Sequence, residues 1–90
     1  MEVTGNVVVI NRLGLHLRAA AQVVKASSQF KCRVLVRHNR SSADAKSLLN
    51  LLGLGAVYGS ELTLVCEGED AQDAQERLKE LFLSRFGEKE

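Results

Sequence analysis

Residues 31–38 read KCRVLVRH, and the alternation of side chains in this stretch decides the fold. In an extended chain, Cys32, Val34 and Val36 point to one side, while Leu35 and three basic residues point to the other. The stretch therefore predicts a strand with one buried face. A sheet built from such strands needs a covering layer on that face only.

Three other stretches also predict strands. Residues 3–10 are rich in Val, residues 41–43 follow a predicted tight turn at Asn39, and residues 61–66 place their apolar side chains on one face. Between these strands and after them, apolar and small residues recur at spacings of three and four, as in a helix with one buried face. This spacing predicts helices over residues 16–28, over residues 47–52, and from Asp70 to about residue 83.

The buried faces of the two longer helices can be named from that spacing. The first face consists of Ala20, Val23, Val24 and Ser27, and the last consists of Ala71, Ala74, Leu78, Leu81 and Phe82. We expect Asp70 to cap the last helix and the chain from Ser84 onward to fray into a polar tail. The glycine-containing stretch 53–59 predicts a loop.

The elements thus follow the order βαββαβα. Because two helices each carry one apolar stripe, they can cover the apolar face of the sheet. The sequence predicts an α/β fold of the α+β kind, a two-layer sandwich whose other sheet face is partly open. We expect residues 1–90 to form a single domain.

Composition limits the location and the partners. Apolar residues make up 46% of the chain, which is enough for one small core. No apolar stretch is long enough to span a bilayer, and the first residues lack the features of a signal peptide, so we expect a cytoplasmic protein. Residues 1–46 carry a net charge of +6 and residues 47–90 one of −5. This asymmetry either steers docking to an acidic partner or is a chance imbalance on a solvated surface.

The two cysteines do not form a metal-binding motif. Cys32 and Cys66 fall in predicted strands and fit no CxxC or zinc spacing. We expect buried, reduced thiols, although a redox bridge between them stays open. Neither a metal site nor a cofactor site is indicated.

Residues 14–18, GLHLR, carry the chemistry that the sequence suggests. His16 lies where a helix begins, and the first N–H groups of a helix have no intrahelical partner and stabilise negative charge. Gly14 permits unusual backbone geometry before it, and Arg18 can grip a phosphate through two hydrogen bonds. A neutral imidazole is available near pH 7 as a nucleophile. The segment therefore predicts a histidine that accepts a phosphoryl group, with Arg18 beside it.

Two stretches resemble one known family. GLHLRAAA, residues 14–21, resembles the active-site motif of HPr, the histidine phosphocarrier of the phosphoenolpyruvate-dependent phosphotransferase system. KSLLNLLGLG, residues 46–55, resembles the regulatory-serine motif of that family at the expected distance. The element order matches as well, and the resemblance covers nearly the whole chain. Residues 11–14 look more like the nitrogen-related NPr branch than the sugar branch.

The resemblance implies a fold and a reaction. The fold is an HPr-like open-faced sandwich, in which three helices cover one face of a four-stranded antiparallel sheet. His16 would accept a phosphoryl group on Nδ1 from phosphorylated enzyme I and pass it to a histidine of an acceptor protein of the enzyme II A-domain type. Arg18 would neutralise the charge that develops. Such a protein is a phosphotransfer carrier and not a stand-alone enzyme.

Two positions depart from the family pattern. HPr proteins usually carry a small residue after the histidine and a proline after the arginine, where this chain has Leu17 and Ala19. Neither change removes the nucleophile or the cation. We expect phosphotransfer to survive and partner choice to shift.

Ser47 has two compatible interpretations. It can cap the short helix that follows, and the resemblance makes it a regulatory phosphorylation site for an HPr kinase/phosphorylase. Because the short helix is apolar nearly all round, we expect Leu48 and Leu52 to be exposed and Leu51 to be buried. The expected partner-binding residues are Leu17, Gln22, Lys25, Lys46, Leu48 and Leu52.

The sequence leaves two alternatives to phosphotransfer. One is a regulatory binding protein on the same fold, acting through Ser47 and the adjacent leucines Leu48 and Leu52 without phosphotransfer, but His16 argues against it. The other is RNA binding through basic residues of the open sheet face, which lacks the aromatic side chains that stack on bases. We therefore expect no nucleic acid and no membrane insertion. A carrier that presents one face to successive partners is most simply a monomer.

Overall fold

Four antiparallel strands form one sheet in the computed structural model, which describes residues 1–90. The strands are β1 (Glu2–Val8), β2 (Arg33–His38), β3 (Ser41–Asp44) and β4 (Glu61–Glu67), and their order across the sheet is β1-β4-β2-β3. Strand β4 lies in the interior and pairs Val3 and Val34 with Cys66 on its two sides. All four predicted strands are confirmed, with ends shifted by one or two residues.

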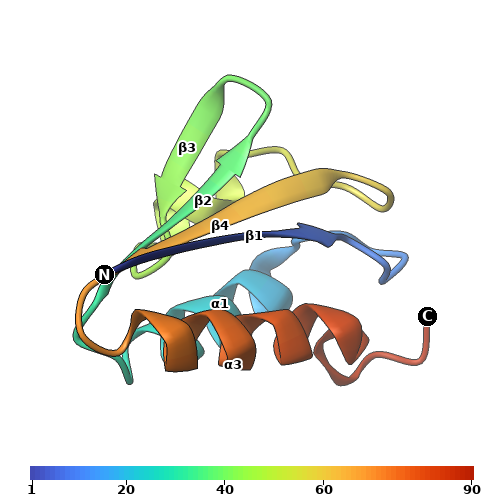
Figure 1. Cartoon of the computed structure of the whole chain (residues 1–90). Helices are drawn as coiled ribbons and strands as arrows, with labels where there is room; N and C mark the ends of the chain where they lie inside the picture. The colour runs from blue at the N-terminus through green and yellow to red at the C-terminus, as the bar shows by residue number, and fades with distance from the viewer.

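Three α-helices complete the structure: α1 (Leu17–Ser27), α2 (Leu48–Leu52) and α3 (Ala71–Leu83). Helices α1 and α3 run side by side beneath the sheet, and α2 packs against α1 and β3 (Figure 1). The predicted open-faced sandwich with the order βαββαβα is confirmed. None of the helices combines the length and the apolar character that crossing a bilayer requires.

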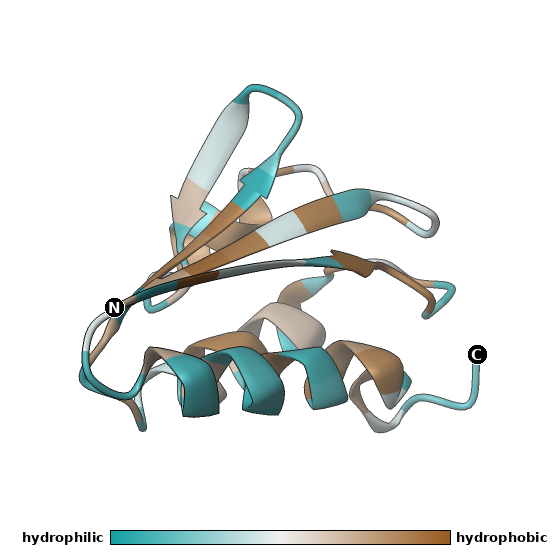
Figure 2. Ribbon diagram, viewed as in Figure 1, coloured by the Kyte–Doolittle hydropathy of each residue, from teal (hydrophilic) through white to brown (hydrophobic).

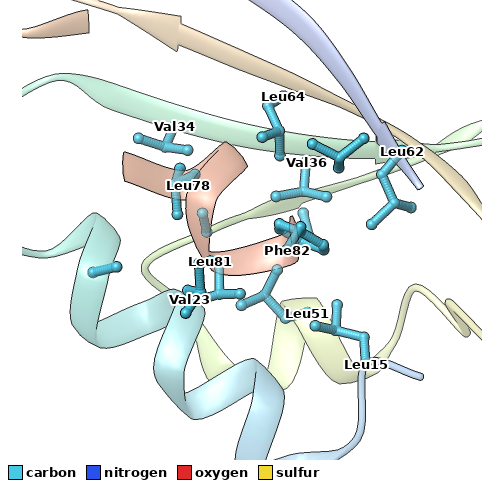
Figure 3. Close-up of a cluster of buried hydrophobic side chains, with 14 of the residues drawn as sticks. Leu15, Val23, Val34, Val36, Leu51, Leu62, Leu64, Leu78, Leu81 and Phe82 are labelled. Atoms are coloured by element: carbon cyan, nitrogen blue, oxygen red, sulfur yellow. The ribbon is translucent and has the colours of Figure 1, made fainter. Parts of the chain in front are cut away.

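The core lies between the sheet and the helices, and it is mostly aliphatic. A cluster of 24 buried residues includes Val34 and Val36 of β2, Leu64 of β4 and Leu78 of α3 (Figure 3). Helix α3 turns its hydrophobic side to the sheet and its hydrophilic side to solvent (Figure 2). The alternation in residues 31–38 thus predicted the buried face correctly. Each fully buried Leu or Val stabilises the fold by about 1.5–3 kcal/mol relative to an exposed one.

Some of the predicted burial is wrong in detail. In α1, Ala19 and Ala26 are buried beside the predicted face, whereas Val24 is only partly buried. On the open face of the sheet, Val65 is buried because its strand β4 is interior, with Thr4 and Leu35 as its register neighbours. The sequence pattern alone did not reveal this position, because its neighbours belong to other strands.

The expected cap of α3 is also wrong. The Asp70 side chain makes no capping hydrogen bond. Its carboxylate instead accepts the backbone N–H groups of Lys31, at 2.8 Å, and Cys32, at 2.9 Å. These bonds lower the pKa of Asp70, the one from Lys31 most strongly. Asp70 therefore ties the start of β2 to the start of α3.

The chain after Ser84 does not fray, contrary to expectation. Residues Arg85–Gly87 form a tight turn, in which the Gly87 N–H donates to the Ser84 carbonyl at 3.0 Å, and Phe86 within it is buried. Arg85, Phe86 and Gly87 have φ values of 55°, 56° and 80°, a left-handed run that reverses the direction of the chain. Burial of the Phe86 ring offsets the cost of the left-handed backbone, about 1–2 kcal/mol per residue other than Gly. The turn directs residues 88–90 toward the loop that precedes α1.

Candidate phosphohistidine site

The loop before α1 is held in one shape by its own hydrogen bonds. Asn11 is fully buried, its side-chain Nδ2 donates to the Gly14 carbonyl at 2.8 Å, and its own carbonyl accepts the Gly14 N–H at 3.1 Å. Gly14 has a φ of 71°, and a Cβ atom there would lie 2.9 Å from the carbonyl oxygen of Ala56. Only glycine fits this position without strain. The loop thus delivers the chain to the helix start in a fixed direction.

His16 is the N-cap of α1. Its backbone is extended, with φ −76° and ψ 179°, and its carbonyl accepts the Ala20 N–H at 2.8 Å. The side chain turns back over the helix end, where Nδ1 accepts the backbone N–H of Arg18 at 3.2 Å. The ring is partly exposed. A ring nitrogen that accepts a hydrogen bond carries a lone pair, so Nδ1 is the atom able to act as a nucleophile.

The other ring nitrogen faces a carboxylate that the sequence did not predict. Oε2 of Glu88 lies 2.5 Å from Nε2 of His16, and Oε1 of Glu88 accepts Nδ2 of Asn11 at 3.0 Å. Burial alone would raise the pKa of Glu88, but hydrogen bonds from His16 and Asn11 and the nearby charge of Arg18 hold it below its usual value. Glu88 is 72 positions from His16 and lies in the segment expected to fray, so no local pattern pointed to it.

Arg18 and the two residues that depart from the family pattern, Leu17 and Ala19, differ in their exposure to solvent. Arg18 and Leu17 are exposed on the first turn of α1, and the guanidinium of Arg18 forms no ion pair in this state. Ala19 is fully buried and belongs to the hydrophobic core. The N–H groups of the first helical turn have no intrahelical partner. An anion at Nδ1 would meet these donors on the same helix turn that carries the exposed cation of Arg18.

The leucines of α2 are only partly as expected. Leu51 is buried and Leu52 is 37% exposed, as predicted. Leu48, predicted to be exposed, is partly buried and packs against the core. Leu49 is instead the most exposed leucine of α2, at 80%. Leu48 and Leu51 are three positions apart and share the face of α2 that meets the core, which leaves Leu49 and Leu52 on the outer face.

The other predicted site residues have roles within the fold. Ser47 is the N-cap of α2, and its Oγ accepts the Asn50 N–H at 3.3 Å. The Lys46 ammonium donates to the Phe30 carbonyl at 2.8 Å, and the Gln22 side chain donates to the Phe86 carbonyl at 3.1 Å. Lys25 remains exposed in the last turn of α1. Helices α1 and α2 are in contact, so Leu17 and the exposed leucines of α2 belong to neighbouring elements.

Neither the other histidine nor the cysteines join this site. Nδ1 of His38 lies 2.9 Å from the carbonyl oxygen of Leu54, so His38 is held by the loop after α2. Cys32 and Cys66 are both buried, as expected, and both are free thiols. The structure contains no group of three or more His, Cys, Asp or Glu side chains placed to hold a metal ion.

Several known proteins are similar to this chain in sequence and in fold. A family model described as the PTS HPr component phosphorylation site matches residues 3–84. The phosphocarrier protein HPr of Cupriavidus necator is 40% identical over 91% of this chain and 92% of its own length. That of Pseudomonas aeruginosa is 41% identical over 93% and 94%. A crystal structure of HPr-C-His from Thermoanaerobacter tengcongensis superimposes with a TM-score of 0.91 at 34% identity, covering 100% of this chain and 99% of the other.

The fold and the relatives together define a phosphocarrier protein of the phosphotransferase system. The chain belongs to the HPr family, as the resemblance of residues 14–21 and 46–55 predicted.

Proposed function

We propose that His16 is the residue that carries the phosphoryl group. In this reaction Nδ1 accepts the group from phosphorylated enzyme I and passes it to a histidine of an acceptor protein of the enzyme II A-domain type. The observation that carries the proposal is the hydrogen bond from the Arg18 N–H to Nδ1 at 3.2 Å. It leaves the lone pair of Nδ1 at the positive end of α1.

The backbone N–H of Arg18 can also stabilise the phosphorylated form of His16. Once phosphorus is bonded to Nδ1, that nitrogen has no lone pair left to accept a hydrogen bond. The Arg18 N–H is then free to donate to a phosphoryl oxygen. The free N–H groups of the first turn and the Arg18 guanidinium add further donors for the same anion.

The docking surface for both partners consists of Leu17, Leu49 and Leu52, and we name it the leucine patch. Its members are exposed on the first turn of α1 and on α2, which are in contact. Lys25 lies further along α1, in its last turn, where it lines a hollow with Gln22 and with Arg77 of α3 and not with the leucines of the patch. Apolar side chains that gather on a surface beside a reactive group are typical of protein docking sites. Lys46 and Gln22 are held elsewhere, by bonds to the backbone carbonyls of Phe30 and Phe86.

Phosphorylation of Ser47 by an HPr kinase/phosphorylase is the proposed regulation. Ser47 is half-buried at the N-terminus of α2, where the helix end favours an added phosphate. The phosphate would place negative charge beside the leucine patch and weaken docking of partners. We further propose that the carrier acts in the cytoplasm. We also propose that it is a monomer, and light scattering would test this by measuring its molecular mass in solution.

Labelling with phosphoenolpyruvate and enzyme I tests the main proposal. The wild-type protein should acquire one acid-labile phosphate, His16→Ala should acquire none, and His38→Ala should be labelled like the wild type. His38 is the only other histidine of the chain, so it is the matched control. Label that persists in His16→Ala would overturn the proposal. Absence of label in the wild type, with ATP-dependent phosphorylation of Ser47, would favour the regulatory binding protein instead.

A further inference from the structure

The residues after α3 fold into a C-terminal strap, Ser84–Glu90, that reaches the phosphohistidine site. The strap is anchored at several points along its length. Phe86 is buried, its carbonyl accepts the side chain of Gln22, and Arg12 pairs with Glu90 through both backbone and side chain. Between these anchors, Glu88 is placed with both carboxylate oxygens in use.

The orientation of the Glu88 carboxylate is fixed by Asn11. Nδ2 of Asn11 donates both to the Gly14 carbonyl and to Oε1 of Glu88, and both partners are acceptors only. Rotating the amide would bring its oxygen against these two acceptors, so its orientation is determined. Oε1 is therefore held by Asn11, and Oε2 is left for Nε2 of His16 at 2.5 Å.

The two partners of the His16 ring select the same tautomer. An ionised carboxylate only accepts, so Nε2 must carry a proton to bond with Glu88. A backbone N–H only donates, so Nδ1 must be unprotonated to bond with Arg18. Both interactions therefore favour the neutral ring with its proton on Nε2 and its lone pair on Nδ1.

We propose that Glu88 is a positioning residue for phosphotransfer, which holds His16 in the Nε2-protonated tautomer and stabilises the positive charge that the ring gains. The inference rests on the proposed function, in which Nδ1 accepts the phosphoryl group. A bond forms between Nδ1 and phosphorus while the bond between phosphorus and the donor group of enzyme I breaks, and its electron pair returns to that donor group. The proton on Nε2 stays in place. The ring of His16 becomes a cation beside the Glu88 carboxylate, and transfer to the acceptor reverses these changes.

This arrangement is the one by which a carboxylate orients a catalytic histidine in hydrolases, where it fixes the tautomer and stabilises the imidazolium without taking the proton. The carboxylate acts on the side of the ring opposite the nucleophilic nitrogen. It therefore need not move aside for the phosphoryl group.

Glu88→Gln is the sharpest test because the glutamine side chain has nearly the same shape but can present a hydrogen-bond donor to Nε2 where the carboxylate presents an acceptor. Asn11 would still require an acceptor, so the glutamine oxygen would face Asn11 and its NH₂ group would face Nε2. That donor favours the tautomer with the proton on Nδ1, which blocks the nucleophile. Glu90→Gln, on the same strap but paired with Arg12, is the matched control.

Two measurements are made on each protein. The ¹⁵N shifts of the His16 ring at pH 9, where a histidine is ordinarily neutral, report the tautomer without any partner. Single-turnover labelling by phosphorylated enzyme I reports the rate. We expect mostly the Nε2–H form in the wild type and in Glu90→Gln. In Glu88→Gln we expect a shift toward Nδ1–H and a rate about tenfold lower.

Glu88→Ala covers the case in which the glutamine disrupts the strap, which the NMR signals of Phe86 would reveal. It removes the carboxylate without adding a donor, so the tautomer preference should weaken and the rate should fall. An unchanged tautomer, or a shifted tautomer with an unchanged rate, would overturn the inference. Absence of phosphate on wild-type His16 would overturn the proposed function instead, while the tautomer measurement would still stand.

Discussion

Phe86 packs edge-on against Phe82, with their ring centroids 4.9 Å apart and their planes at 68°. Phe82 belongs to α3 and to the core, whereas Phe86 lies in the left-handed turn that follows. This one aromatic contact therefore joins the C-terminal strap to the hydrophobic core. Because Glu88 is only two residues further on, the same contact sets where its carboxylate lies.

Phe86→Ala should destabilise the protein and free the strap together. Removal of a buried phenylalanine ring costs about 3 kcal/mol of the free energy of unfolding. The measurement is urea denaturation, combined with hydrogen exchange of residues 84–90. The control is Leu83→Ala, whose side chain is 72% exposed on the same helix end and whose loss should change stability by less than about 0.5 kcal/mol. Equal stability of the two variants would contradict the anchoring role of Phe86.

Gly14→Ala should damage both stability and phosphotransfer. The added Cβ would lie 2.9 Å from the backbone at Ala56 and Val57, and the φ of 71° is unfavourable for alanine. We expect a loss of about 2 kcal/mol in the free energy of unfolding and slower labelling of His16. Gly55→Ala is the control, because its φ is 65° but nothing lies within 4 Å of the added atom. Gly55→Ala should lower the free energy of unfolding by only about 1 kcal/mol and leave the rate of His16 labelling unchanged.

The sequence revealed those features that depend on local patterns. Alternation in residues 31–38 identified the buried face of β2, and the residues around His16 identified the start of α1. The roles of Asp70 and Glu88 could not be read in this way, because their partners lie 38 and 72 positions away. A carboxylate before a helix is typical of a cap, and a polar C-terminus is typical of a frayed end. Only the folded chain shows that tertiary partners take both side chains.

Substitution of Leu48 should affect mainly the stability of the protein, whereas substitution of Leu49 should affect mainly its binding to enzyme I. Leu48 packs against the core, so Leu48→Ala should lower the free energy of unfolding by about 1.5 kcal/mol. Leu49 is 80% exposed, so Leu49→Ala should leave stability within about 0.5 kcal/mol. The latter change should weaken binding to enzyme I about fivefold, by loss of one apolar contact. Calorimetric titration with enzyme I measures this, and unchanged affinity would exclude Leu49 from the leucine patch.

The stability of the protein should depend on Glu88 at neutral pH and not in acid. Despite its burial, the pKa of Glu88 is lowered in the folded state by its bonds to His16 and Asn11. A lowered pKa means that the stabilisation is present above the ordinary pKa of about 4.3 and is lost as pH falls through the folded value. Urea denaturation at pH 7, 5 and 3 measures the free energy of unfolding of the wild type and of Glu88→Gln, and the difference between the two should shrink in acid. A difference that stays constant with pH would indicate that the charge of Glu88 does not contribute to stability.

Cys32 should resist alkylation in the folded protein more strongly than an ordinary thiol. Burial, followed by a hydrogen bond to Asp70 and the charge of that carboxylate, raises the pKa of Cys32 to about 11. At pH 8 only about one thiol in a thousand is then ionised, and the thiolate is the reactive form. Iodoacetamide labelling followed by mass spectrometry should be at least about 100-fold slower at Cys32 in buffer than in 8 M urea. Asp70→Asn removes the carboxylate charge and should speed labelling of Cys32 in the folded state. If Asp70→Asn leaves that rate unchanged while the fold is intact, the carboxylate does not control the thiol and burial alone protects it.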